Sequence, residues 1–132
     1  MIYYYGCSSF GKNHPKETRV SGGGIFRARL RPDGFVSVDA GTLTTKLLQC
    51  EGEKLFVNGV GPVAVELIDR DGRTLGSATV TGDSLRHKVV FGGKSLRKLA
   101  SGNAVRLRFT VKDRGHLYSF MCADDDNLRK PQ

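Results

Sequence analysis

The feature that most constrains this chain is a run of residues, 104–112, in which apolar and polar side chains alternate almost without fault. Successive side chains of a β-strand point to opposite faces of a sheet, so this period of two predicts a strand with one buried face and one solvent face. The predicted buried residues are Val105, Leu107, Phe109 and Val111. The predicted solvent-facing residues are Arg106, Arg108, Thr110 and Lys112.

Similar apolar runs recur at intervals of roughly 8 to 12 residues, the spacing that is typical of sandwiches and barrels. Turn sequences such as Asp71-Gly72 separate the runs, and most of the 17 glycines of the chain fall between them. We therefore predict an all-β fold, an antiparallel two-sheet β-sandwich of jelly-roll-like form with about ten strands. At most one short helical turn is expected, near residues 95–100, where Ser95 can cap it.

A chain of 132 residues is the size of one domain. We predict a single sandwich domain over residues 1–123. It contains an exposed loop at 8–23, where the periodicity is lost. The charged residues 124–132 predict a flexible tail.

Residues 24–41 predict the opening hairpin of the sandwich. Phe26, Ala28 and Leu30 alternate with arginines, which is the pattern of a half-buried strand. Pro32-Asp33-Gly34 has the residue types of a tight turn. Residues 35–40 are then expected to return beside the first strand.

The arginines Arg27, Arg29 and Arg31 share the outer face of that first strand and are candidate ligand-binding residues. The formal net charge of the chain is +8, and a basic chain attracts polyanions such as nucleic acid. A wider basic stripe forms only if this strand and 104–112 share an outer face. Alternatively, the basic residues simply occupy the solvent faces of strands, because they are scattered along the chain.

Tyr3 and Tyr5 share one face of a short aromatic strand at 2–7. Aromatic rings can stack on sugar rings or on bases, so these tyrosines are further candidates for ligand binding. The alternative is a half-buried edge strand whose tyrosines only pack.

No constellation in the sequence predicts catalysis. The histidines His14, His87 and His116 lie in unrelated segments, and no serine lies in a G-x-S-x-G turn. Carboxylate pairs such as Asp39 and Glu66 have no spacing that predicts glycoside hydrolysis. We therefore expect a protein that is not an enzyme and needs no cofactor.

The three cysteines, Cys7, Cys50 and Cys122, are widely spaced and odd in number. Such a set does not predict a disulfide framework, and the lack of a C-x-x-C pair argues against a structural zinc site. Two alternatives stay open, which are three buried thiols or one disulfide with one free thiol.

No apolar run approaches the ~20 residues that a membrane-spanning helix needs. The first residues, M-I-Y-Y-Y-G-C, lack the basic start and the long apolar stretch of a signal peptide. We expect either a cytosolic chain or a piece cut from a longer, secreted protein.

Several segments together resemble the C-terminal β-sandwich module of bacterial proteins similar to family 32 glycoside hydrolases, in which a five-bladed propeller precedes the sandwich. The first are R-L-R-P-D-G-F-V-S-V-D-A-G at 29–41 and L-T-T-K at 43–46. Y-Y-Y-G at 3–6 is similar to a last propeller strand. The later ones are V-E-L-I-D-R-D-G at 65–72, G-D-S-L-R-H at 82–87 and V-R-L-R-F-T-V-K-D-R-G-H-L-Y-S-F at 105–120.

This resemblance implies an accessory module rather than a catalyst. In that family the nucleophile and the acid lie in the propeller, so no catalytic residue is carried over to this chain. The module packs against the propeller and in some members contacts carbohydrate. The resemblance thus favours carbohydrate as the ligand, with a polyanion, or self-association through open edge strands, as the alternatives.

Overall fold

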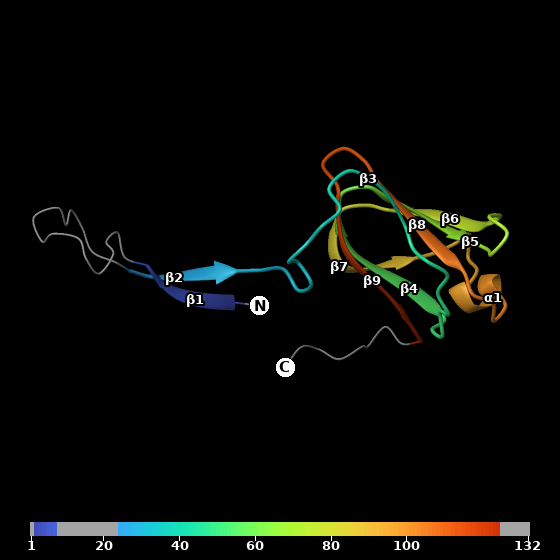
Figure 1. Cartoon of the computed structure of the whole chain (residues 1–132), viewed down its shortest axis with the longest axis horizontal. Coiled ribbons are helices and arrows are strands. Elements are labelled where there is room, and N and C mark those ends of the chain that lie inside the picture. The colour runs from blue at the N-terminus through green and yellow to red at the C-terminus, as the bar shows by residue number, and fades with distance from the viewer. Residues whose placement is uncertain (1, 8–23, 125–132) are drawn as a thin grey trace, which may run out of the picture. The chain divides into compact units, whose positions relative to one another are not determined.

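The computed structural model describes residues 2–7 and 24–124 (Figure 1). The chain divides into two compact units, residues 1–35 and 36–132, and each is described by itself. The predicted loop at 8–23 and most of the predicted tail, 125–132, lie outside the described residues. The prediction of one domain over 1–123 stays a prediction.

The second unit is a sandwich of two antiparallel sheets, as predicted. One sheet has four strands in the order β3-β8-β5-β6, which are β3 (Gly41–Thr44), β8 (Arg106–Val111), β5 (Val63–Ile68) and β6 (Thr74–Val80). The other has three strands in the order β7-β4-β9, which are β7 (Asp83–Val89), β4 (Lys54–Val60) and β9 (His116–Ala123). Figure 1 shows β5, β6 and β8 in one layer and β4, β7 and β9 in the other.

The core lies between these two layers and is built from their alternating residues. On β8, Leu107 and Phe109 are fully buried, whereas Arg106 and Arg108 on the opposite face stay partly exposed, so the predicted alternation is confirmed. Leu55 and Val57 of β4 meet them from the other sheet. Burial of each such side chain stabilises the fold by about 1.5–3 kcal/mol.

One short helix, α1 (Leu96–Ala100), lies where a helical turn was expected. The Ser95 side chain accepts a hydrogen bond from the backbone N–H of Lys98 at 3.2 Å, which caps the first turn. Leu96 and Ala100 are buried, so the helix packs one face on the core.

The Asp71-Gly72 turn forms the predicted hairpin between β5 and β6. Gly72 has a φ of 88°, and the Asp69 carboxylate accepts a hydrogen bond from the backbone N–H of Arg73 at 2.8 Å. The Asp69 side chain therefore helps to close the turn.

The predicted hairpin at 24–41 is wrong in its pairing. β2 (Gly24–Arg29) pairs with β1 (Ile2–Cys7), antiparallel and over six residue pairs, to form a two-stranded sheet of the first unit. The turn itself forms, since the Gly34 N–H bonds the Arg31 carbonyl at 2.9 Å. Residues 35–40 do not return beside β2, because Val38 forms a bridge to Leu117 of β9 instead.

Candidate functional site

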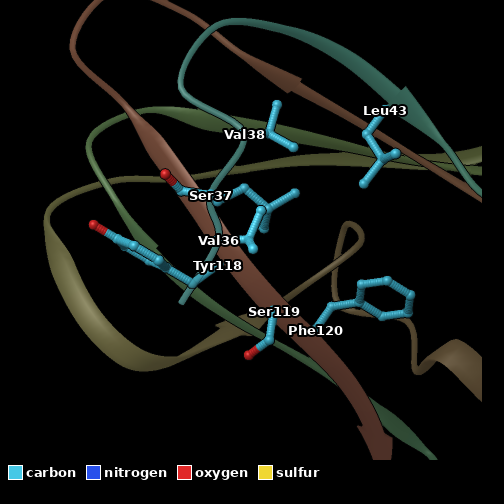
Figure 2. A pocket seen from close by; sticks show the side chains of 8 residues that line it. Val36, Ser37, Val38, Leu43, Tyr118, Ser119 and Phe120 are labelled. Atoms are coloured by element: carbon cyan, nitrogen blue, oxygen red, sulfur yellow. The ribbon is translucent and has the colours of Figure 1, made fainter. Parts of the chain in front are cut away.

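A pocket of about 290 Å³ opens on the second unit, between the segment 36–38, β3 and β9 (Figure 2). Its lining residues are Val36, Ser37, Val38, Leu43, Leu117, Tyr118, Ser119 and Phe120. Five of these eight side chains are apolar, and the other three carry hydroxyl groups.

The pocket exists because two strands that end their sheets lie on the same side of the sandwich. β3 is the outermost strand of the four-stranded sheet, and β9 is the outermost strand of the three-stranded sheet. The segment that precedes β3 is joined to β9 by a bridge, in which the Val38 N–H bonds the Leu117 carbonyl at 2.9 Å and the Leu117 N–H bonds the Val38 carbonyl at 3.0 Å. This bridge covers part of the open side and leaves the pocket beside it.

The apolar wall of the pocket connects the core to solvent. Phe120 packs on Phe109 of the core, with ring centroids 5.1 Å apart and ring planes 33° apart. Leu43 is 38% exposed, and Val36 is 77% exposed. In Figure 2 the rings of Phe120 and Tyr118 extend from β9 in opposite directions. A ligand that covers the apolar wall would gain roughly 25 cal/mol for each Å² removed from water.

A polar cluster lies next to the pocket, formed by Ser37, Asp39 and His116. His116 Nδ1 lies 2.8 Å from Asp39 Oδ1, and the Ser37 hydroxyl donates to the same carboxylate oxygen. The hydrogen bond from Ser37, followed by that from His116, holds the pKa of the Asp39 carboxyl below its usual value. The cluster fastens the segment that carries Val38 to the start of β9.

This cluster contains the residue types of a serine hydrolase triad but not its connectivity. In a triad the imidazole bonds the serine hydroxyl through one ring nitrogen and the carboxylate through the other. Here the Ser37 hydroxyl donates to the Asp39 carboxylate, which also bonds His116, so the serine–imidazole–carboxylate order of a triad is not formed. The arrangement holds the segment 37–39 against the start of β9.

None of the residues predicted to bind ligand lines this pocket. On the first unit, Tyr3 and Tyr5 of β1 pair with Ala28 and Phe26 of β2, and Arg27 pairs with Tyr4. Cross-strand partners share a sheet face and neighbours alternate, so positions 3 and 5 belong to one face of the sheet and the arginine positions, with position 4, to the other.

The arginines themselves lie at the end of this two-stranded sheet. Arg27 and Arg29 are exposed on β2, and Arg31 lies half-buried just beyond it. Arg29 pairs with Ile2, at the opposite end of the ladder from Cys7.

The wider basic stripe is not assembled by any described sheet. β2 pairs with β1, while β8 pairs with β3 and β5, so the two arginine rows belong to different sheets. In addition, Arg108 forms an ion pair with Glu66 at 3.4 Å, which offsets its charge.

His87, Cys50 and Cys122 each have a close polar partner. His87 is half-buried on β7, with Nε2 3.2 Å from the carbonyl of Gly59 on the neighbouring strand β4. Cys50 and Cys122, both half-buried, place their Sγ atoms 2.9 Å apart. Across residues 2–7 and 24–124 no group of three or more His, Cys, Asp or Glu side chains could hold a metal ion.

The sequence did not predict the pocket or the polar cluster. Asp39 and His116 are 77 positions apart, and no local pattern joins them. Residues 36–40, V-S-V-D-A, even keep the alternation that predicted a return strand, so no local signal marked this segment as part of a site.

Comparisons with protein-family models, with curated proteins and with solved structures find no match. The resemblance to the sandwich module of family 32-like proteins therefore stays a prediction. Within the described part of the chain, no helix has the length and apolar character to cross a membrane.

Proposed function

We propose that this chain is a non-catalytic β-sandwich accessory module, that the pocket beside β3 and β9 is its ligand site, and that its ligand is a carbohydrate. The observation that carries this is the mixed lining, in which an apolar wall of Val36, Leu43 and Phe120 adjoins hydroxyl-bearing side chains. A sugar ring has an apolar C–H face and a rim of hydroxyl groups, so it matches a lining of both kinds. The family resemblance favours the same class of ligand.

The direct test is calorimetric titration of the whole protein with fructans and plant polysaccharides. Leu43→Glu places a charge in the apolar wall at a solvent-facing edge strand, so we expect binding to weaken at least tenfold, about 1.4 kcal/mol. Leu85→Glu is the matched control, because Leu85 is 47% exposed on β7 and does not line the pocket. If the unmodified protein releases no heat of binding with any of these carbohydrates, the carbohydrate proposal is wrong. If Leu43→Glu and Leu85→Glu bind with equal affinity, the pocket is not the binding site.

A second function is self-association or partner binding through the same side of the sandwich. Val36 is 77% exposed and Leu43 of β3 is 38% exposed, and among the described strands β3 pairs on one edge with β8 and on the other edge with none. Exposed apolar side chains beside an open strand edge favour protein contact. Val36→Ser, with Val90→Ser as the control, should then shift a dimer to a monomer in sedimentation velocity. A wild-type monomer at all concentrations would exclude self-association.

Polyanion binding is the remaining alternative, and it depends on the exposed Arg27 and Arg29 of β2. Retention on heparin that falls steeply with added salt, and that is lost in an Arg27→Ala/Arg29→Ala variant, would favour it over carbohydrate binding. Neutral fructan binding that is unchanged by salt would favour the pocket.

A further inference from the structure

Two cysteines far apart in the sequence meet at one end of the second unit. Cys50 lies in the connection that precedes β4, and Cys122 is the next-to-last residue of β9. Their Sγ atoms are 2.9 Å apart, although 72 positions separate the two residues along the chain.

The backbones on either side of the pair are already held together. A Cβ atom on Gly52 would lie 2.2 Å from the backbone N of Ala123, so the two backbone segments are in direct contact there. One residue further, the Glu53 N–H bonds the Asp124 carboxylate at 2.9 Å.

Arg97 of α1 fastens the same two segments from outside. Its guanidinium donates to the Asp124 carboxylate at 2.8 Å and to the Glu51 carbonyl at 2.9 Å. Contacts at three successive points therefore fix the distance between the segments that carry the two thiols.

We propose that Cys50 and Cys122 are a redox site that closes reversibly to a disulfide. A disulfide requires an S–S separation of about 2.05 Å, so the two sulfur atoms must approach by only about 0.9 Å. Side-chain rotation and small backbone shifts supply such a change, because the flanking segments are already adjacent. This inference is independent of the pocket and of the ligand proposed for it.

The two thiols have different roles in the reaction. Cys122 donates its S–H to Cys50, and this hydrogen bond lowers the pKa of the Cys50 thiol. The same contact and burial raise the pKa of Cys122. We expect Cys50, which accepts the hydrogen bond, to be the thiolate that attacks first, and Cys122 to be the thiol that resolves the product.

The oxidant is a small disulfide such as oxidised glutathione. The Cys50 thiolate attacks one of its sulfur atoms, which forms a mixed disulfide and releases one glutathione thiolate. Cys122 loses its proton to water and attacks the Cys50 sulfur, which releases the second glutathione. In total the protein gives up two electrons and two protons, and one small disulfide becomes two thiols.

The test uses the whole protein as a Cys7→Ser variant, so that only these two thiols remain. The variant is equilibrated with mixtures of reduced and oxidised glutathione, quenched by alkylation and weighed by intact mass spectrometry. We expect both thiols to disappear together, a Cys50–Cys122 peptide after digestion, and full return of both thiols on reduction. If both thiols still alkylate at the most oxidising ratio, or if the chain forms only intermolecular disulfides, the redox site is excluded.

The order of attack has its own control in Cys122→Ser. Without the resolving thiol, the mixed disulfide with glutathione should accumulate on Cys50. An unmodified Cys50 in this variant under the same conditions would contradict its role as the first nucleophile. The oxidised protein should also unfold at a temperature at least about 5 °C higher than the reduced protein, since the bond closes a long loop. Equal midpoints would show that the bond does not join the two segments as the structure indicates.

Discussion

Gly52 is a residue at which the fold has no room for any side chain. A Cβ atom there would lie 2.2 Å from the backbone N and 2.5 Å from the Cα of Ala123, and backbone atoms cannot rotate away as a side chain can. We expect Gly52→Ala to lower the free energy of unfolding by about 3 kcal/mol, which is at the upper end for overpacking.

The control for this prediction is Gly82→Ala, measured by urea denaturation in parallel. Gly82 has open space around its Cβ position but a φ of 86°, so that substitution should cost only the backbone strain, about 1 kcal/mol. Equal losses for the two variants would contradict the close approach at Gly52.

Asp39 is the residue whose titration reports the polar cluster beside the pocket. Hydrogen bonds from Ser37 and His116 lower the pKa of its carboxyl from 3.8. A group with a lowered folded pKa adds stability above its unfolded pKa and loses it as the pH falls through the folded pKa. The contribution of Asp39 should therefore decline below about pH 4.

Carboxyl NMR titration of Ser37→Ala checks the cause of this shift. Because the Ser37 hydrogen bond is the larger contribution, the pKa of Asp39 should rise toward 3.8 in that variant. An unchanged Asp39 titration would show that Ser37 does not hold the carboxylate.

At the scale of single residues, the sequence predicted the burial and capping of side chains that follow a local pattern. It did not predict contacts between residues that are far apart in the chain. The burial of Leu107 and the cap at Ser95 follow from a period and a turn, which neighbours in sequence determine. The contacts between Asp39 and His116, or between Cys50 and Cys122, depend on which strands end their sheets. No residue pattern within a segment carries that information.

On β8, buried and exposed side chains alternate, so substitutions on its two faces should change the free energy of unfolding by very different amounts. Leu107 is fully buried in the core, so Leu107→Ala should lower the free energy of unfolding by about 2–5 kcal/mol. Lys112, exposed just after the strand, should change it by less than about 0.5 kcal/mol when replaced by alanine.

Chemical denaturation with an unchanged slope on denaturant concentration is the measurement for both variants. A small loss in Leu107→Ala would mean that the two layers are not packed through β8. A large loss in Lys112→Ala would mean that the solvent-facing side of this segment carries a contact the structure does not contain.

The sequence analysis predicted the wrong strand partner for β2. A tight-turn signal at Pro32-Asp33-Gly34 predicted pairing with the residues that follow it, and the turn does form. Yet a turn fixes only the direction of the chain, and a strand also needs a partner whose alternate residues match over its length. β1 pairs with β2 over six residues, while Val38 has a backbone partner on β9.

At the scale of the whole molecule, the open side of the sandwich is where the proposals on ligand binding and on protein contact meet. Each sheet of a two-sheet sandwich ends in edge strands, and an edge strand is either covered by other parts of the chain or free to contact a partner. Here the segment 36–40 covers one part of the side between β3 and β9, and the pocket occupies another. Cys122 lies further along β9 and Cys50 lies before β4, and neither lines the pocket, so ligand binding and disulfide formation can be tested separately.

The division of the chain at Phe35 and Val36 leads to the last prediction. Residues 36–132 form a compact unit that contains both larger sheets, α1 and the core between the layers. A unit with its own core is expected to fold without the rest of the chain. We therefore expect the fragment 36–132 to unfold cooperatively and to keep the amide NMR shifts of β4, β5 and β8 seen in the whole protein. A fragment with poorly dispersed amide signals and a broad transition would show instead that residues 1–35 are needed to complete the sandwich.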